Sequence, residues 1–200
     1  MNLLLYLSLL VLIFANAVPI LGVVILGWDI KTLAAIYWFE AGIQGFFAII
    51  RIFKSEGPLS RKAFLKDRIF TSLIKLPIIP FFATNYFIFL VVYGILLYLI
   101  IGIENLEFIP ILYMILVFFI SHLISFYVNF IKRMEFKKES PIKQIFEPYR
   151  RYGLTHLAVF MGVIAAKYSE FPQNWVLITA LVKTILDASL HIKEHKRGVS

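Results

Sequence analysis

Four ionisable side chains lie inside long apolar stretches of this 200-residue chain, and each belongs to a different stretch. They are Glu40, His122, His156 and Asp187. An ionisable group at membrane depth is costly unless other polar groups satisfy it, so such residues usually face the interior of a helix bundle. Counted from the nearest basic segments, three of them lie in the same half of a membrane and Glu40 lies near its middle. We therefore expect one shared polar cluster.

The last apolar stretch adds further polar residues on one face. Lys183, Asp187 and His191 recur every four residues, so they align along a helix, and His191 is expected to border the cluster. One interpretation is a metal site, because imidazole and carboxylate groups bind zinc or iron. The other is that Lys183 and Asp187 neutralise each other. Residues 191–195 also match the H-x-x-E-H order of inverted zinc peptidases, a short pattern at a basic helix end where chance matches are common.

Other polar residues share the faces of these groups at helical spacing and are expected to support the cluster. On the second apolar stretch they are Tyr37 and Gln44, and on the fourth they are Ser125 and Asn129. For His122 and His156, a hydrogen-bonded contact between helices is an alternative to a ligand role.

Several intramembrane chemistries lack the residues they need. The chain has no Cys, which excludes disulfides, thiolate metal sites and a cysteine nucleophile. It has no G-x-S-x-G elbow and no H-E-x-x-H helix. Of three Asp residues, Asp187 alone lies within an apolar stretch. A paired-aspartate protease and an aspartate-rich prenyl-diphosphate site are therefore excluded.

The elements that must position these residues are membrane helices. Hydrophobic residues make up 60% of the chain and charged residues 16%, and the mean hydropathy is +0.85. The apolar stretches match the roughly 20 residues that a helix needs to cross a bilayer, and they lack the alternation of barrel strands. We expect an all-α fold: a polytopic membrane helix bundle forming a single integral membrane domain over residues 1–200. The six predicted transmembrane helices span about 3–28, 32–51, 77–103, 108–131, 149–167 and 172–192.

The distribution of Lys and Arg predicts the orientation. Seven lie in residues 51–75, seven in 132–151 and three after residue 192, whereas the opposite side keeps Lys31 and Lys167. Because basic loops remain in the cytoplasm, we predict a multi-pass protein of the cell membrane with both termini cytoplasmic. The net charge of +8 then needs no nucleic-acid partner. The lipid bilayer is the predicted partner, and the sequence identifies no protein partner.

Three local patterns lead to further expectations. Ala15-Asn16-Ala17 has the form of a signal-peptidase site, but no basic residue precedes the first stretch, so we expect residues 1–17 to be retained. Residues 59–74 have the apolar face of an interfacial helix. A short helix is expected to begin at Ser140-Pro141 and to stop before Pro148.

Four groups of residues carry a resemblance over nearly the whole chain. They are Tyr37-Trp38-Phe39-Glu40, Ser121-His122 with Asn129, Pro148-Tyr149-x-Arg151 with His156, and the segment from Lys183 to His195. In this order they resemble an uncharacterised family of prokaryotic multi-pass membrane proteins, classified as a domain of unknown function. The resemblance implies a six-helix fold and an intramembrane polar cluster, and it implies no activity.

The chain departs from the pattern of that family on the third helix. The family pattern has two His residues there, eight positions apart, and this chain has Asn85 and Tyr93 instead. Asn85 is therefore only a supporting candidate, and a metal site would have fewer ligands.

Three classes of function remain open. The first is a cytoplasm-facing polar site, metal-binding or catalytic, built from Glu40, His122, His156, Asp187 and His191. The second is a small-ion or proton-coupled transporter that uses Glu40 with the pair of Lys183 and Asp187. The third is a non-catalytic membrane partner protein in which the cluster serves helix packing. The sequence does not show whether the protein is an enzyme.

Overall fold

The structure, a computed structural model, describes residues 3–58, 67–104 and 106–197, and in these residues it is helical without strands. The all-α fold class is confirmed. The elements are α1 (Leu3–Leu26), α2 (Ile30–Lys54), α3 (Asp67–Ile101), α4 (Phe108–Ser125), the π-helix η1 (Phe126–Lys132), α5 (Glu135–Lys138), α6 (Pro141–Tyr168) and α7 (Pro172–Arg197).

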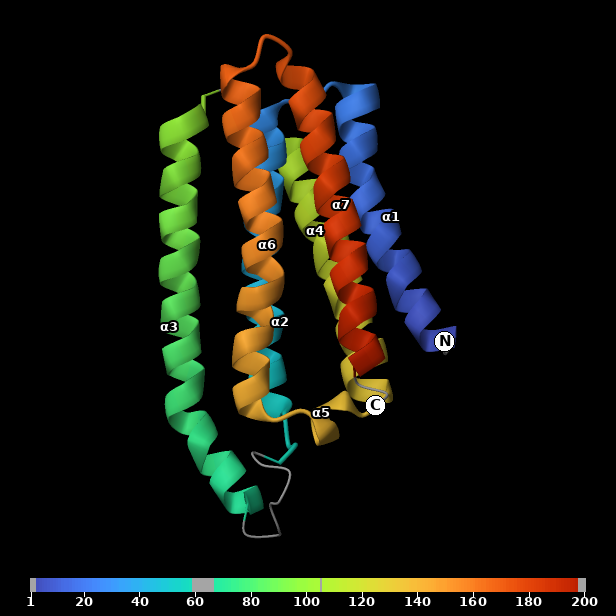
Figure 1. Cartoon of the computed structure of the whole chain (residues 1–200), viewed down its shortest axis with the longest axis vertical. Coiled ribbons are helices and arrows are strands. Elements are labelled where there is room, and N and C mark those ends of the chain that lie inside the picture. The colour runs from blue at the N-terminus through green and yellow to red at the C-terminus, as the bar shows by residue number, and fades with distance from the viewer. Residues whose placement is uncertain (1–2, 59–66, 105, 198–200) are drawn as a thin grey trace.

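The long helices lie side by side along one axis and reverse direction at each connection (Figure 1). Helix α2 is central: it packs against α3, α4, α6 and α7. Helix α7 packs against α1 and α6, and α3 lies at one edge against α2 and α6. The N and C ends of the chain lie in the same half of the bundle, the half that contains α5 (Figure 1).

Local signals in the sequence account for several helix boundaries. The side chain of Asp29 accepts a hydrogen bond from the backbone N–H of Thr32 at 2.8 Å and so caps α2. Ser140 caps α6 in the same way through Lys143, with Pro141 in the first turn, as the sequence predicts. Gly27, just after α1, has a φ of 69°, a left-handed conformation that favours glycine.

The surface is apolar while polar residues are buried, which is the reverse of a soluble protein. Large hydrophobic side chains are exposed on the outer faces of α1, α3 and α4, for example Phe14, Leu76 and Ile109. Five helices are long and apolar enough to cross a membrane: Tyr6–Leu26, Ile30–Lys54, Ser72–Ile101, Phe108–Lys132 and Pro172–Lys193. These features fit a membrane protein in a lipid bilayer.

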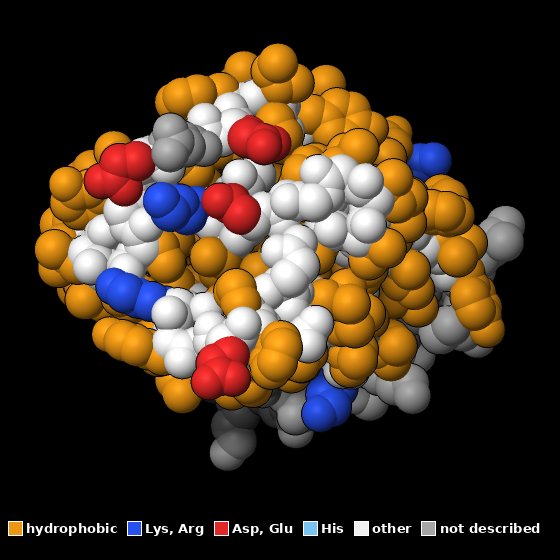
Figure 2. All heavy atoms as spheres, turned by 90° about the horizontal axis from the view of Figure 1, so that it is seen from above, with side chains coloured by type: hydrophobic (Ala, Val, Ile, Leu, Met, Phe, Trp, Pro, Cys, Tyr) orange, Lys and Arg blue, Asp and Glu red, His pale blue; other side chains and the backbone are white. Residues whose placement is uncertain are grey.

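The end of the bundle opposite the termini is weakly charged. Its short connections carry Lys31 and Lys167 among the acidic residues Asp29, Glu104 and Glu170. Figure 2 shows this end, where a few acidic and basic side chains lie among backbone atoms and apolar side chains. Lys31 forms an ion pair with Glu104 at 3.6 Å.

Two helices begin earlier in the chain than the transmembrane segments predicted within them. Helix α3 begins at Asp67 rather than at 77, so residues 67–74 of the predicted interfacial helix belong to α3; residues 59–66 lie outside the described residues. Pro77 and Pro80 lie within α3, and its first turns bend away from the rest of the helix (Figure 1).

Helix α6 begins at Pro141 and continues through Pro148, so the prediction of a separate short helix that stops before Pro148 was wrong; the predicted span of 149–167 lies within α6. The physical reason is packing. Ile145, in the first turns of α6, is buried against a cluster that includes Ile52 and Phe82. This burial offsets the backbone hydrogen bond that Pro148 cannot make.

Candidate functional site

Lys183 of α7 is the centre of a buried charge cluster. Its ammonium group lies 2.5 Å from Oε2 of Glu40 on α2 and 2.7 Å from Oδ2 of Asp187, one turn along α7. It also donates a hydrogen bond to Oδ1 of Asn16 on α1 at 2.6 Å. The ammonium group therefore has three polar partners on three helices, two of them carboxylates in ion pairs and one an amide oxygen that accepts a hydrogen bond. The four side chains are almost fully buried.

Two aromatic rings complete the surroundings of the ammonium group. Its nitrogen lies 4.8 Å from the ring centre of Tyr37 and 4.9 Å from that of Phe118. Rings at this distance attract a cation through their electron-rich faces. Tyr37 lies on the same face of α2 as Glu40 and Gln44, and all three are buried, as their spacing predicts.

His122 meets this cluster from α4. Its Nε2 atom lies 3.6 Å from Oε1 of Glu40, and Nε2 of Gln44 donates a hydrogen bond to the same oxygen at 3.2 Å. The side chain of His122 is 15% exposed, compared with 2% for Glu40, so His122 lies at the margin of the cluster. With two carboxylates and one ammonium group, the charges of the cluster do not cancel unless a proton is bound at a carboxylate or at His122.

A second polar group lies nearer the termini. It joins Ser8 of α1, Asn129 of η1 and His191 of α7: Nε2 of His191 lies 3.1 Å from the Ser8 hydroxyl, and Nδ2 of Asn129 donates to that hydroxyl at 3.0 Å. Asn129 also donates to Ser125 at 3.3 Å. His191 lies one helical turn from Asp187, about 6 Å along α7.

The predicted common face of His122, Ser125 and Asn129 is divided in the structure. His122 meets Glu40 on α2, whereas Asn129 donates hydrogen bonds to Ser8 on α1 and to Ser125. The helix changes from α to π geometry at Phe126, and a π-helix turns less per residue than an α-helix. A spacing of seven residues therefore no longer returns a side chain to the same face.

His156 lies on another side of α2, in an aromatic wall between α3 and α6. Its ring centre is 5.3 Å from that of Tyr93 and 6.2 Å from that of Phe89. The residue is buried. The structure thus brings Glu40, His122 and Asp187 together around Lys183 and places His156 in different, aromatic surroundings.

Asn85, predicted as a supporting residue, lies away from the charge cluster. It is exposed on α3, and its side-chain amide donates to the backbone oxygen of Phe81, one turn earlier in the same helix. An amide that is satisfied within its own helix needs no interior partner.

Sequence reasoning missed Asn16, which it noted only as part of a cleavage-site pattern. A buried lysine ammonium group has three protons to donate, and Glu40 and Asp187 account for only two partners. A third polar partner on another helix could therefore have been sought.

The donor set does not fit a metal ion. Across the described ranges, no three or more His, Asp or Glu side chains form a group that could hold one. Glu40 and Asp187 already share the Lys183 ammonium group, which occupies the position of a cation between them. The structure therefore gives no support to the zinc or iron interpretation. In the H-x-x-E-H pattern, the side chains of Glu194 and His195 lie outside the described residues.

Comparison with protein families gives one match. The model of a family of unknown function, DUF6498, matches residues 4–199. The chain belongs to this family. The match spans all the helices that form the charge cluster and agrees with the resemblance seen in the sequence. Comparisons with curated proteins and with solved structures give no match.

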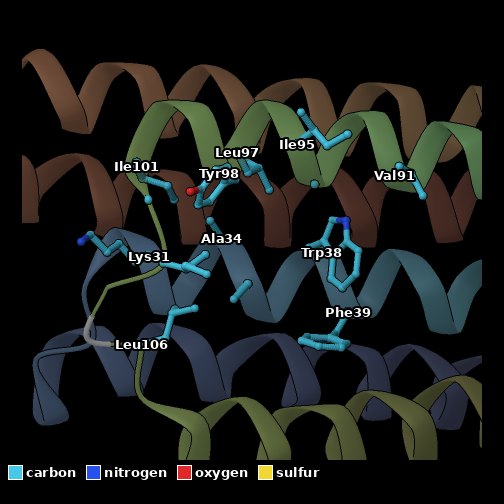
Figure 3. A pocket seen from close by; sticks show the side chains of 14 residues that line it. Lys31, Ala34, Trp38, Phe39, Val91, Ile95, Leu97, Tyr98, Ile101 and Leu106 are labelled. Carbon is cyan, nitrogen blue, oxygen red and sulfur yellow. The ribbon is translucent and has the colours of Figure 1, made fainter.

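Two of the hollows outside the charge cluster have Trp38 or His156 in their walls. The first, of about 440 Å³, lies between α2 and α3, with Trp38 in its wall and Lys31 at one end (Figure 3). Lys31 is paired with Glu104, and the indole N–H of Trp38 donates to the backbone oxygen of Leu90, so these polar groups are already satisfied. The second, of about 300 Å³, lies between α3 and α6 beside His156.

Proposed function

We propose that the chain crosses the cell membrane six times, with both termini in the cytoplasm. Helix α6 is the sixth span. It lies parallel to the axis of the five apolar helices, packs between α2, α3 and α7, and joins the two ends of the bundle (Figure 1). The shared location of the two termini requires an even number of crossings. The Lys and Arg residues are concentrated at that end, which supports the cytoplasmic assignment.

Labelling of introduced cysteines tests this topology, because the chain has none of its own. We expect a membrane-impermeant maleimide to label Glu170→Cys in intact cells and Lys138→Cys only after permeabilisation. These positions flank α6 and are exposed. If both are labelled from the same side, α6 does not cross the membrane.

We further propose that the cluster of Glu40, Lys183 and Asp187 is the proton-binding site of a transporter or channel that moves protons across the membrane. The observation that carries this proposal is the uneven charge of a buried cluster: two carboxylates share one ammonium group, and His122 adjoins Glu40 at 3.6 Å. A bound proton neutralises the remaining charge, and its gain or loss changes which groups hold Lys183. Buried groups of this kind within membrane helices are characteristic of proton relays.

The polar group of Ser8, Asn129 and His191 supports a route for protons towards the termini. It lies between the charge cluster and the end of α7 that carries Lys193. Oδ1 of Asp187 has no hydrogen-bond partner within the described ranges. The site then opens towards the cytoplasm, and proton transfer is the reaction that its groups can perform without a metal.

Flux in proteoliposomes tests the proton-site proposal. We expect vesicles containing the protein to dissipate an imposed pH gradient, read by an enclosed pH-sensitive dye, several times faster than empty vesicles. Glu40→Gln should abolish this flux. This change leaves Lys183 and Asp187 as a neutral pair, so the fold should be retained.

The matched control is Glu104→Gln, which changes the same side chain on the surface and should keep the flux of the unaltered protein. A flux equal to that of empty vesicles would refute proton transport. Full flux in a folded Glu40→Gln protein would show instead that the cluster serves only helix packing.

A further inference from the structure

The hollow between α3 and α6 contains a polar group that the protein itself does not satisfy. Tyr93 forms part of its wall and is 5% exposed, and its hydroxyl has no hydrogen-bond partner in the part of the chain that the structure describes. An unsatisfied hydroxyl inside a membrane protein is costly. This hydroxyl is itself buried, so a molecule in the hollow reaches it when the ring of Tyr93 turns towards the hollow.

The walls of this hollow are suited to a flat ring. The rings of Phe89 and Tyr93 are stacked, with an angle of 11° between their planes. The ring centres of His156 and Phe160 lie 5.3 and 6.5 Å from that of Tyr93. Aromatic walls of this kind favour an aromatic or conjugated guest. The volume of about 300 Å³ is at the lower end of the range for small-molecule pockets.

The lining charges and the position of the hollow further limit the class of molecule that can bind there. Among the residues whose side chains the structure describes, no Lys or Arg lines it, so these residues offer nothing to a phosphate or carboxylate head group. Val92, Leu96 and Leu157 in its wall are also exposed on the outer surface of the bundle, where the lipid lies. A guest therefore enters from the bilayer and carries no charge.

We propose that this hollow binds a lipid-soluble quinone, a flat uncharged ring with a carbonyl oxygen that accepts the hydrogen bond of the Tyr93 hydroxyl. The site is separate from the charge cluster, and its occupancy does not depend on proton transport. Gly153 lines the hollow, and a Cβ atom at this position would meet nothing within 4 Å, so there is open space beside it. A larger side chain at Gly153 fills the hollow without disturbing the packing of the protein.

Calorimetric titration with 2-methyl-1,4-naphthoquinone tests the proposal, with protein in nanodiscs and empty nanodiscs as the blank. The quinone cannot alkylate a thiol here because the chain has no Cys. We expect saturable binding of one molecule per chain. Gly153→Leu should weaken it at least tenfold, and Tyr93→Phe about fivefold, as for the loss of one hydrogen bond.

Two controls complete the experiment. Gly42→Leu makes the same change on α2, where a Cβ atom also meets nothing within 4 Å, and should leave binding unchanged. 2-Methylnaphthalene has the ring without the carbonyls and should bind at least fivefold more weakly, with no further loss in Tyr93→Phe. Binding that does not saturate, or that Gly153→Leu leaves intact, would overturn the site. Equal affinity for the two compounds would overturn the quinone and indicate an apolar guest such as a lipid chain.

Discussion

The two buried regions that contain His122 and His156 differ in how their polar groups are satisfied. Around Lys183, the ammonium group forms ion pairs with Glu40 and Asp187 and donates a hydrogen bond to Asn16, although Oε2 of Glu40 and Oδ1 of Asp187 lack hydrogen-bond partners in the described ranges. Around Tyr93, aromatic rings surround a hollow, and the Tyr93 hydroxyl also lacks a hydrogen-bond partner in those ranges. Burial of a polar group alone therefore does not identify a site. The first region is held together by charges on different helices, whereas the second is lined by aromatic rings and has a hollow of about 300 Å³.

The first region should be the one on which stability depends. Lys183 connects α7 to α1 and α2, and removal of one partner from a buried ion pair leaves an uncompensated charge. The following substitutions measure this contrast, and their expected effects decrease in order.

Lys183→Met should have the largest effect. It leaves Glu40 and Asp187 buried without a cation, and we expect a loss of about 3–5 kcal/mol in the free energy of unfolding, measured by denaturant titration in mixed micelles. Lys31→Met is the control: its pair with Glu104 is exposed, so its loss should stay below about 1 kcal/mol. Equal losses would mean that the cluster does not stabilise the bundle.

Asn16→Ala removes the third acceptor of Lys183. A hydrogen bond to a buried charge contributes about 1.5–3 kcal/mol, and we expect a loss of that size in the same titration. Asn85→Ala removes an exposed amide that is bonded within its own helix and should change stability by less than about 0.5 kcal/mol. A larger loss for Asn85→Ala than for Asn16→Ala would contradict the assignment of Asn16 to the cluster.

Gly162→Leu and Gly153→Leu place the same side chain at two positions on α6. A Cβ atom at Gly162 would overlap the side chain of Thr179 on α7, so the larger residue should cost about 1–3 kcal/mol. Gly153 faces open space, and its replacement should be neutral or stabilising, because glycine is a poor helix former. Thermal unfolding followed by circular dichroism separates the two. Similar melting temperatures would mean that α6 and α7 are not closely packed.

Tyr93→Phe should have the smallest effect on stability. The hydroxyl has no partner in the described part of the chain, so its removal should change the free energy of unfolding by less than about 0.5 kcal/mol. Tyr86→Phe is the matched control on the same helix: its hydroxyl donates to the backbone oxygen of Ala41 at 2.9 Å, and its loss should cost about 1 kcal/mol. The opposite order would mean that Tyr93 is already satisfied within the protein.

The helical fold and the buried polar faces could be predicted from the sequence because they depend on local patterns. Apolar stretches of membrane length, the helix caps at Asp29 and Ser140, and the face shared by Tyr37, Glu40 and Gln44 are all set by residues close together in the chain. The i, i+4 spacing of Lys183 and Asp187 likewise predicted their pairing. The family match over residues 4–199 agrees with the motifs that carried the resemblance.

The choice of partners was decided only by the tertiary structure. The pairing of Lys183 with Asn16 joins residues 167 positions apart, and it depends on how α1 and α7 are rotated against each other. The π-helix at Phe126 moved His122 away from the face of Asn129, and packing of Ile145 carried α6 through Pro148. Local patterns determine which residues are turned inward, because they depend on helical spacing. The contacts between helices determine which residues meet, because those contacts depend on the packing of the whole bundle.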